Sequence, residues 1–193
     1  PLGALQAAKA LGRDTFERLI VLTSLSKRSN VPGLRSGFVA GDAAVIKSFL
    51  LYRTYHGSAM DPAVQHASIA AWSDEDHVVA NRALYREKFA RVTPLLANAL
   101  DVALPDAGFY LWAQVSPTVH ESNTTSTTSD IAFALGLLAQ YNVTVLPGSL
   151  LARDAHGINP GNGRIRMPHA AGVDECVEAA ERIAAYSKSL QRP

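Results

Sequence analysis

The feature that most constrains the fold is a continuous apolar run at residues 19–22 that ends in a cluster of polar residues. Because the run is continuous rather than alternating, it predicts a strand over 18–23 that is buried on both faces, as in α/β proteins. The polar segment at residues 23–27 (TSLSK) places Lys27 at the carboxyl end of this strand. Ligands of open α/β sheets collect at that edge, so the segment is a candidate binding site.

The side chains at this strand end suit a carbonyl compound that carries a phosphate. A lysine amine forms Schiff bases with carbonyl compounds, pyridoxal phosphate among them. Ser24 and Ser26 can hydrogen-bond a phosphate. Arg35, eight residues after Lys27, can pair with it as a planar, charged fork. A lysine after a strand is more often an ordinary surface residue, but these neighbours at these offsets favour a functional site.

The same letters also allow an acyl-enzyme site. Residues 24–27 (SLSK) match S-x-x-K, the nucleophile motif of serine β-lactamases and penicillin-binding proteins. That motif opens a helix and needs S-D-N and K-T-G partners. The sequence contains neither tripeptide, and Pro32 and Gly33 follow the lysine closely. This interpretation is therefore the weaker one, and labelling of Ser24 by a β-lactam would test it.

Composition limits the other classes of function. Of the 193 residues, 48% are hydrophobic and 18% are charged, and the net charge is +1. Scattered basic residues argue against a nucleic-acid partner. No apolar run approaches the roughly 20 residues of a membrane helix, so we expect a soluble, cytoplasmic protein without membrane contact. No metal site is expected, because the histidines lack a ligand spacing and Cys176 is the single cysteine.

Helical and strand patterns alternate along the rest of the chain. Helices are expected over residues 2–11, 43–52, 62–72, 73–103, 129–141 and 173–190, and further strands over 37–41, 108–112, 143–146 and 164–167. Residues 116–129 and 147–163 are predicted to be loops. The order favours an α/β unit followed by a smaller α+β unit, with the boundary inside the long helix near residues 75–105.

Residues 23–38 (TSLSKRSNVPGLRSGF) resemble the cofactor-lysine segment of fold-type I, class I/II aminotransferases. Three further segments resemble more narrowly the N-succinyldiaminopimelate aminotransferases of bacterial lysine biosynthesis: residues 52–57 (YRTYHG), 142–149 (NVTVLPGS) and 151–161 (LARDAHGINPG). The resemblance extends over nearly the whole chain. It implies that residues 1–85 are the C-terminal part of a large domain that binds pyridoxal phosphate, and that residues 86–193 form the small α+β C-terminal domain.

The resemblance also implies a role for each candidate in the first unit. Lys27 would form the Schiff base with pyridoxal phosphate and then move a proton between the substrate α-carbon and the cofactor. For that it must be neutral at the working pH, so its pKa should be depressed. Ser24 and Ser26 would hydrogen-bond the cofactor phosphate, and Arg35 would balance its charge.

In the second unit the resemblance points to an arginine. Arg166 matches the position that clamps the substrate α-carboxylate, as a bidentate arginine can. Arg164 is two residues away and would share a strand face with it, so it is the fallback for the same role. The aromatic strand at 108–112 matches a segment that forms core and substrate wall, and residues 55–57 have at most a minor role at the cofactor or substrate.

The activity implied is transfer of an amino group between N-succinyl-LL-2,6-diaminopimelate and 2-oxoglutarate by a homodimer. Another class I/II aminotransferase, of aspartate or aromatic type, is one alternative, and a non-catalytic aminotransferase-like regulatory module is another. Family members place an aspartate for the pyridinium nitrogen before the lysine, and only 26 residues precede Lys27. We therefore expect this chain alone to be inactive.

Overall fold

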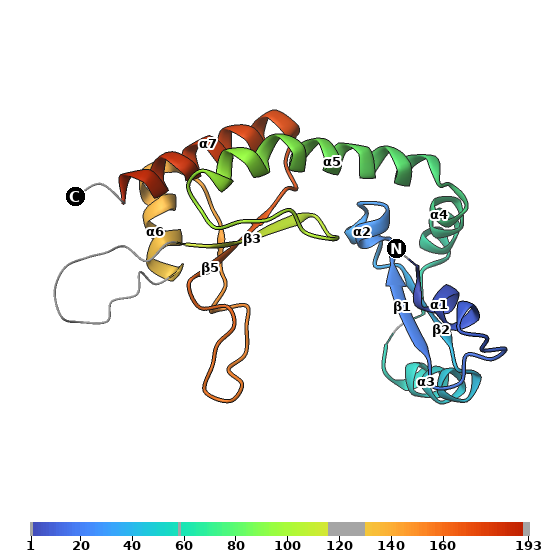
Figure 1. Ribbon diagram of the computed structural model, residues 1–193. Helices are drawn as coiled ribbons and strands as arrows, with labels where there is room; N and C mark the ends of the chain where they lie inside the picture. Colours follow the sequence, from blue (N-terminus) through green and yellow to red (C-terminus); the bar gives the residue numbers. More distant parts are fainter. Residues whose placement is uncertain (1, 58, 116–129, 191–193) are drawn as a thin grey trace. The chain divides into compact units, whose positions relative to one another are not determined.

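The computed structural model describes residues 2–57, 59–115 and 130–190, which form two compact units (Figure 1). The first unit ends at Asn81 and the second begins at Arg82, so the division falls within helix α5 (Asp76–Ala97). Among the described residues, no helix combines the length and the apolar character needed to cross a bilayer. The loop predicted at 116–129 lies outside the described residues.

A β-hairpin is the centre of the first unit. Strand β1 (Ile20–Ser24) pairs antiparallel with β2 (Gly37–Gly41), and the register sets Ser24 opposite Gly37. The connection between the strands holds the short helix α2 (Leu25–Arg28) and the 3-10 turn η1 (Pro32–Leu34). Three longer helices complete the unit: α1 (Ala4–Ala10), α3 (Ala43–Tyr55) and α4 (Pro62–Ser73).

Aspartate caps fix the starts of α3 and α4. The Asp42 carboxylate accepts bonds from the first backbone N–H groups of α3, and Asp61 does the same for α4. Pro62 occupies the first helical position, as predicted, where its missing N–H has no partner to lose. Each aspartate therefore fixes the residue at which its helix begins.

The predicted burial of the first strand on both faces is wrong for the described chain. Leu22 on β1 is 70% exposed, and Phe38 on β2 is 45% exposed. A hairpin of two strands cannot cover its own faces, so a continuous apolar run stays partly in water unless another layer packs on it. Helix α3 likewise has no buried residue, although its sequence is apolar.

The second unit is a three-stranded antiparallel sheet in the order β3-β5-β4. Its strands are β3 (Tyr110–Gln114), β5 (Arg164–Pro168) and the short β4 (Leu146–Pro147). Helices α5 and α7 (Val173–Ser189) run side by side along it, with α6 (Asp130–Tyr141) beside them (Figure 1).

Strand β4 is shorter than the strand predicted over 143–146, and it lies further along the chain. Its ladder with β5 pairs Leu146 with Arg166 and Pro147 with Ile165. Continuing it would bring Thr144 opposite Pro168, which has no N–H to donate. The predicted long helix is also shorter, since α5 ends at Ala97 shortly after Pro94.

Alternation along β3 and β5 divides the two faces of this sheet. Leu111 and Ile165 are fully buried in a core that also holds Leu137 of α6, Leu96 of α5 and Ile183 of α7. The intervening side chains point to the other face: Tyr110 and Trp112 from β3, and Arg164 and Arg166 from β5. The second unit therefore has a contiguous core behind one face and a polar, aromatic surface on the other.

Two glycines hold the long loop at 147–163 closed. A Cβ atom on Gly148 would lie 2.4 Å from the carbonyl oxygen of Gly161, and one on Gly161 would lie 2.1 Å from that of Gly148. The buried Asp130 carboxylate accepts a bond from the Ser149 N–H at 2.8 Å, and the Asn159 amide donates to the Ser149 carbonyl at 3.1 Å. The loop is thus a fixed structure beside β5.

Candidate active site

Lys27 lies in the connection that joins β1 to β2. It is exposed in the single turn of α2, directly after the strand end at Ser24. The Ser24 hydroxyl oxygen accepts the Ser26 N–H at 3.3 Å, which caps this turn. Because that bond uses an oxygen lone pair, the Ser24 hydroxyl hydrogen can still be donated to a ligand.

A buried leucine anchors the turn beneath Lys27. Leu25 is fully buried, and its N–H donates to the Ser36 carbonyl at 3.1 Å. The Ser36 hydroxyl accepts from the buried Ser68 of α4 at 2.7 Å. These bonds join the two ends of the 25–36 connection to each other and to α4, so Lys27 is presented from a rigid base.

Arg28, the neighbour of Lys27, is directed inward. Its guanidinium lies 4.9 Å from the centre of the Trp72 ring and donates to the Ala71 carbonyl at 2.7 Å. It also forms an ion pair with Glu75. Sequence reasoning missed this role, although the i, i+3 spacing of Leu25 and Arg28 places both on one face of a helical turn.

A histidine links the same connection to the start of α5. The His77 ring contacts the Asp74 carboxylate at 2.6 Å through Nδ1 and the Ser29 hydroxyl at 2.9 Å through Nε2. The side-chain bond to His77 lowers the pKa of Asp74 from its usual 3.8. Asn30 and Asn81 are joined by a further side-chain bond of 2.7 Å. None of these anchoring residues was identified from the sequence.

Arg35 occupies the last turn before β2 in a left-handed backbone conformation, with φ of 50°. One guanidinium nitrogen donates to the Pro32 carbonyl at 2.9 Å, and within the described residues no carboxylate pairs with this side chain. Hydroxyls at Ser24 and Ser26, a guanidinium at Arg35 and an amine at Lys27 thus come from one connection. This donor set fits a phosphorylated aldehyde, with the amine for the carbonyl carbon and the other groups for the phosphate.

Arg166 belongs to the second unit, on the open face of its sheet. Its guanidinium lies 5.2 Å from the centre of the Tyr110 ring, and its Nε is buried without a hydrogen-bond partner in the described part of the chain. Arg164 projects from the same face, as its spacing predicts. A guanidinium held by an aromatic ring and lacking an anion is suited to bind a carboxylate.

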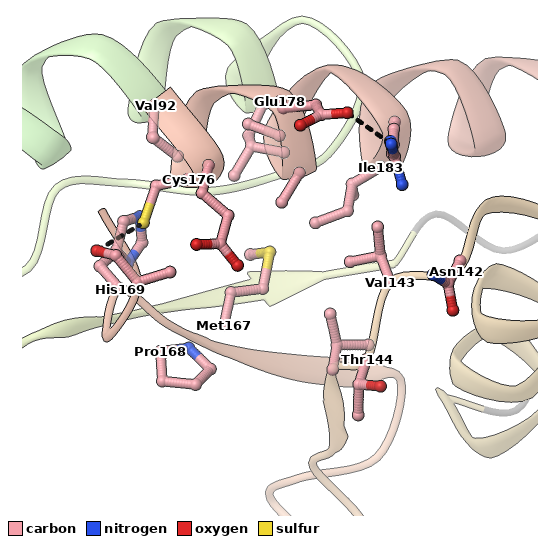
Figure 2. A pocket seen from close by; sticks show the side chains of 17 residues that line it. Val92, Asn142, Val143, Thr144, Met167, Pro168, His169, Cys176, Glu178 and Ile183 are labelled. Atoms are coloured by element: carbon pink, nitrogen blue, oxygen red, sulfur yellow. Dashed lines mark hydrogen bonds and ion pairs between the residues drawn. The ribbon is translucent and has the colours of Figure 1, made fainter. Parts of the chain in front are cut away.

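A pocket of about 380 Å³ lies on the core side of the same sheet (Figure 2). Met167 and Cys176 line it, together with His169 at the end of β5. His169 is buried, and its carbonyl accepts a bond of 2.9 Å from Lys88. Burial lowers the pKa of His169 and raises that of the Cys176 thiol. None of the predicted site residues lines this pocket.

Comparison with known proteins identifies relatives of nearly the whole chain. The sequence profile of the family described as "Aminotransferase class I and II" matches residues 3–183. An LL-diaminopimelate aminotransferase from Dehalococcoides mccartyi is 30% identical over 168 residues, which are 86% of this chain and 39% of that protein. The chain therefore spans less than half the length of such relatives.

Solved structures agree with the fold. An aminotransferase from Neisseria meningitidis is 56% identical, with a TM-score of 0.84 over 100% of this chain and 45% of that one. A probable N-succinyldiaminopimelate aminotransferase from Thermus thermophilus is 25% identical, with a TM-score of 0.73 over 90% of this chain and 43% of that one. The mixed α/β fold predicted from the sequence is confirmed by these matches.

Proposed function

Because the chain belongs to the class I and II aminotransferase family, whose cofactor is pyridoxal phosphate, we propose that the whole protein is a transaminase. It transfers an amino group between N-succinyl-LL-2,6-diaminopimelate and 2-oxoglutarate, in bacterial lysine and diaminopimelate biosynthesis. Relatives named for diaminopimelate and N-succinyldiaminopimelate support this substrate. We further propose a cytoplasmic homodimer in which residues 1–85 belong to the large domain and residues 86–193 form the small one.

The observation that carries the proposal is the exposed Lys27 amine on a firmly anchored turn, with hydroxyls and a guanidinium in the same connection. When bound, pyridoxal phosphate supplies an electron sink for charge that develops at the substrate α-carbon. Ser24, Ser26 and Arg35 would hold its phosphate. The Lys27 amine would hold its aldehyde carbon and would move the proton at the substrate α-carbon.

Arg166 orients the substrate by binding its α-carboxylate. The Tyr110 ring holds the guanidinium in place, and the buried Nε gains its missing partner when an anion is bound. A bidentate bond of this kind fixes the rotation of the amino acid, so that the C–H bond to be broken can be aligned for proton transfer.

Borohydride reduction of the complete protein with pyridoxal phosphate tests the cofactor site. We expect an absorbance band near the visible edge and, after reduction and peptide mapping, label on Lys27. The exposed Lys9 and Lys47 provide internal controls for non-specific labelling. Label spread evenly over the surface lysines would contradict the assignment of Lys27.

A panel of amino donors tests the substrate. Transfer from N-succinyl-LL-2,6-diaminopimelate should be faster than transfer from aspartate, tyrosine or alanine. The alternative, an aspartate or aromatic aminotransferase, is favoured by relatives named aspartate aminotransferase and would reverse this order. Labelling of Lys27 without amino transfer from any donor would favour a non-catalytic regulatory module.

A further inference from the structure

We infer that Arg164 is a specificity-determining residue that selects substrates with a second carboxylate. The inference rests on the proposed function, because it takes Arg166 as the partner of the α-carboxylate. It assigns to Arg164 a separate role from the fallback for Arg166 considered above. Two carboxylates of one dicarboxylic substrate would then be bound by two arginines of a single strand.

The register of the sheet places the two arginines for this task. Arg166 pairs with Trp112 and Arg164 with Gln114, so both project from the open face of β5. Residues two apart on a strand are separated by roughly 6.6 Å, and two flexible side chains at this separation can reach the two ends of one short dicarboxylate. Both guanidinium groups can therefore act on a single bound molecule.

Electrostatics indicate that this pair needs an anion. Two other arginines of the second unit have carboxylate partners: Arg91 pairs with Asp174 at 3.0 Å, and Arg182 pairs with Glu178. Within residues 82–115 and 130–190, no carboxylate pairs with Arg164 or Arg166, although both are half-buried. Two neighbouring positive charges without counter-ions repel each other, and a dianion relieves that repulsion.

The neighbours of Arg164 are a glycine, an aromatic ring and an amide. Gly148, which lies across from Arg164 and donates its N–H to the Arg164 carbonyl at 2.7 Å, has no side chain. The Trp112 ring would lie 2.7 Å from a Cβ atom at Gly148, so the ring packs directly against this glycine. Gln114 on the other side is held by a 2.8 Å bond from its amide to the Gly163 carbonyl. These neighbours offer Arg164 no competing negative charge.

Ligands that differ by one carboxylate test the inference on the complete protein with its cofactor. We would measure binding of glutarate and butyrate by calorimetry, and kcat/KM for 2-oxoglutarate and 2-oxobutyrate, in the wild type and in Arg164→Gln. Glutarate affinity and kcat/KM for 2-oxoglutarate should each fall about tenfold or more, mostly through KM. The values for butyrate and 2-oxobutyrate should change less than about twofold.

Two further variants separate recognition from structure. Arg164→Lys retains the charge but not the fork, so its selectivity should lie between those of the other two proteins. Arg86→Gln removes an exposed arginine of α5 and should change the affinity for neither glutarate nor butyrate. Thermal unfolding of each variant reports whether a loss of binding follows a loss of fold.

Three results would overturn the inference. The wild type could bind glutarate no better than butyrate, Arg164→Gln could weaken both ligands equally, or it could weaken neither. The second result would indicate that Arg164 acts on the carboxylate that both ligands share. Failure of the proposed function is distinct, because it appears as absent amino transfer and unlabelled Lys27 whatever the selectivity for glutarate.

Discussion

The two units of the chain differ in how much of their apolar surface they bury themselves. In the second unit, side chains from α5, α6, α7 and the sheet form one core with several residues completely excluded from water. In the first unit the buried apolar side chains are few, and larger ones such as Leu22, Phe49 and Leu50 stay exposed. Burial of apolar surface is the main source of stability, so the second unit is far better supported from within.

The poorly buried unit nevertheless holds a firmly anchored loop. The connection that carries Lys27 is fixed by polar contacts: Arg28 to α4, Ser36 to Ser68, and Ser29 to His77. Local anchoring and global burial are therefore separate properties. The difference predicts that changes in the lysine connection of the first unit affect chemistry and cofactor binding, whereas changes in the core of the second unit affect stability.

The largest expected effect follows from removing the amine. Lys27→Ala in the complete protein should lower kcat/KM by roughly 10²–10⁴-fold, because a positioned proton-transfer group is lost. The thermal midpoint should change little, since Lys27 is exposed. Steady-state kinetics and thermal unfolding without cofactor provide the two readouts. Retained activity in Lys27→Ala, or a large fall in its thermal midpoint, would contradict the prediction that Lys27 contributes to catalysis but not to stability.

A pair of leucine truncations tests the difference in burial directly. Leu137→Ala, at a fully buried position of α6, should destabilise the second unit by about 2–5 kcal/mol. Leu22→Ala, at a position 70% exposed, should change stability by less than about 0.5 kcal/mol if the strand is equally exposed in the whole protein. Denaturant unfolding followed by peptide-resolved hydrogen exchange measures each unit. A large cost at Leu22 would show that another part of the protein covers β1.

Arg28→Lys tests the anchoring of the lysine turn. The variant keeps the charge but loses the fork that contacts Ala71 and Glu75, so Lys27 should be held less precisely. We expect cofactor affinity to fall roughly tenfold, as measured by absorbance titration. Arg18→Lys, at an 89% exposed side chain of the same unit, is the matched control and should bind cofactor normally. Equal affinities in both variants would contradict the anchoring role.

The smallest effect concerns pH in the second unit. Burial, reinforced by the charge of Lys88, lowers the pKa of His169 below its usual 6.5. The unfolded state then takes up a proton more readily than the folded state, so stability is lost as the pH falls below about 6.5. The thermal midpoint of the wild type should drop more between about pH 7.5 and about pH 5.5 than that of His169→Gln. Parallel pH profiles would exclude this contribution.

Sequence patterns correctly predicted the structural features that depend only on residues close together in the chain. The shared face of Arg164 and Arg166 follows from strand alternation, and the position of Lys27 after a strand follows from the end of an apolar run. The bond from Lys88 to His169 joins residues 81 positions apart, and no local pattern indicates it. The anchoring of Arg28 depends in the same way on where α4 packs.

Burial of the first strand was the clearest failure, for a related reason. An apolar run reports the preference of a segment for a covered environment, but the covering layer is supplied by other segments. In the described chain β1 has β2 as its strand partner, and Leu22 remains in water. The apolar run therefore predicts that β1 needs a covering layer, but it does not predict which segment supplies that layer.

The close approach of Gly148 and Gly161 has a consequence for how this loop can evolve. At either position a methyl group would meet the backbone carbonyl of the other glycine in addition to a side chain. A second substitution at the other glycine leaves its backbone carbonyl in place. A larger residue at one position therefore cannot be compensated by a change at the other. Among homologues that keep this loop, each glycine should therefore be retained. The two positions should not show the correlated substitutions that are usual for pairs of contacting side chains.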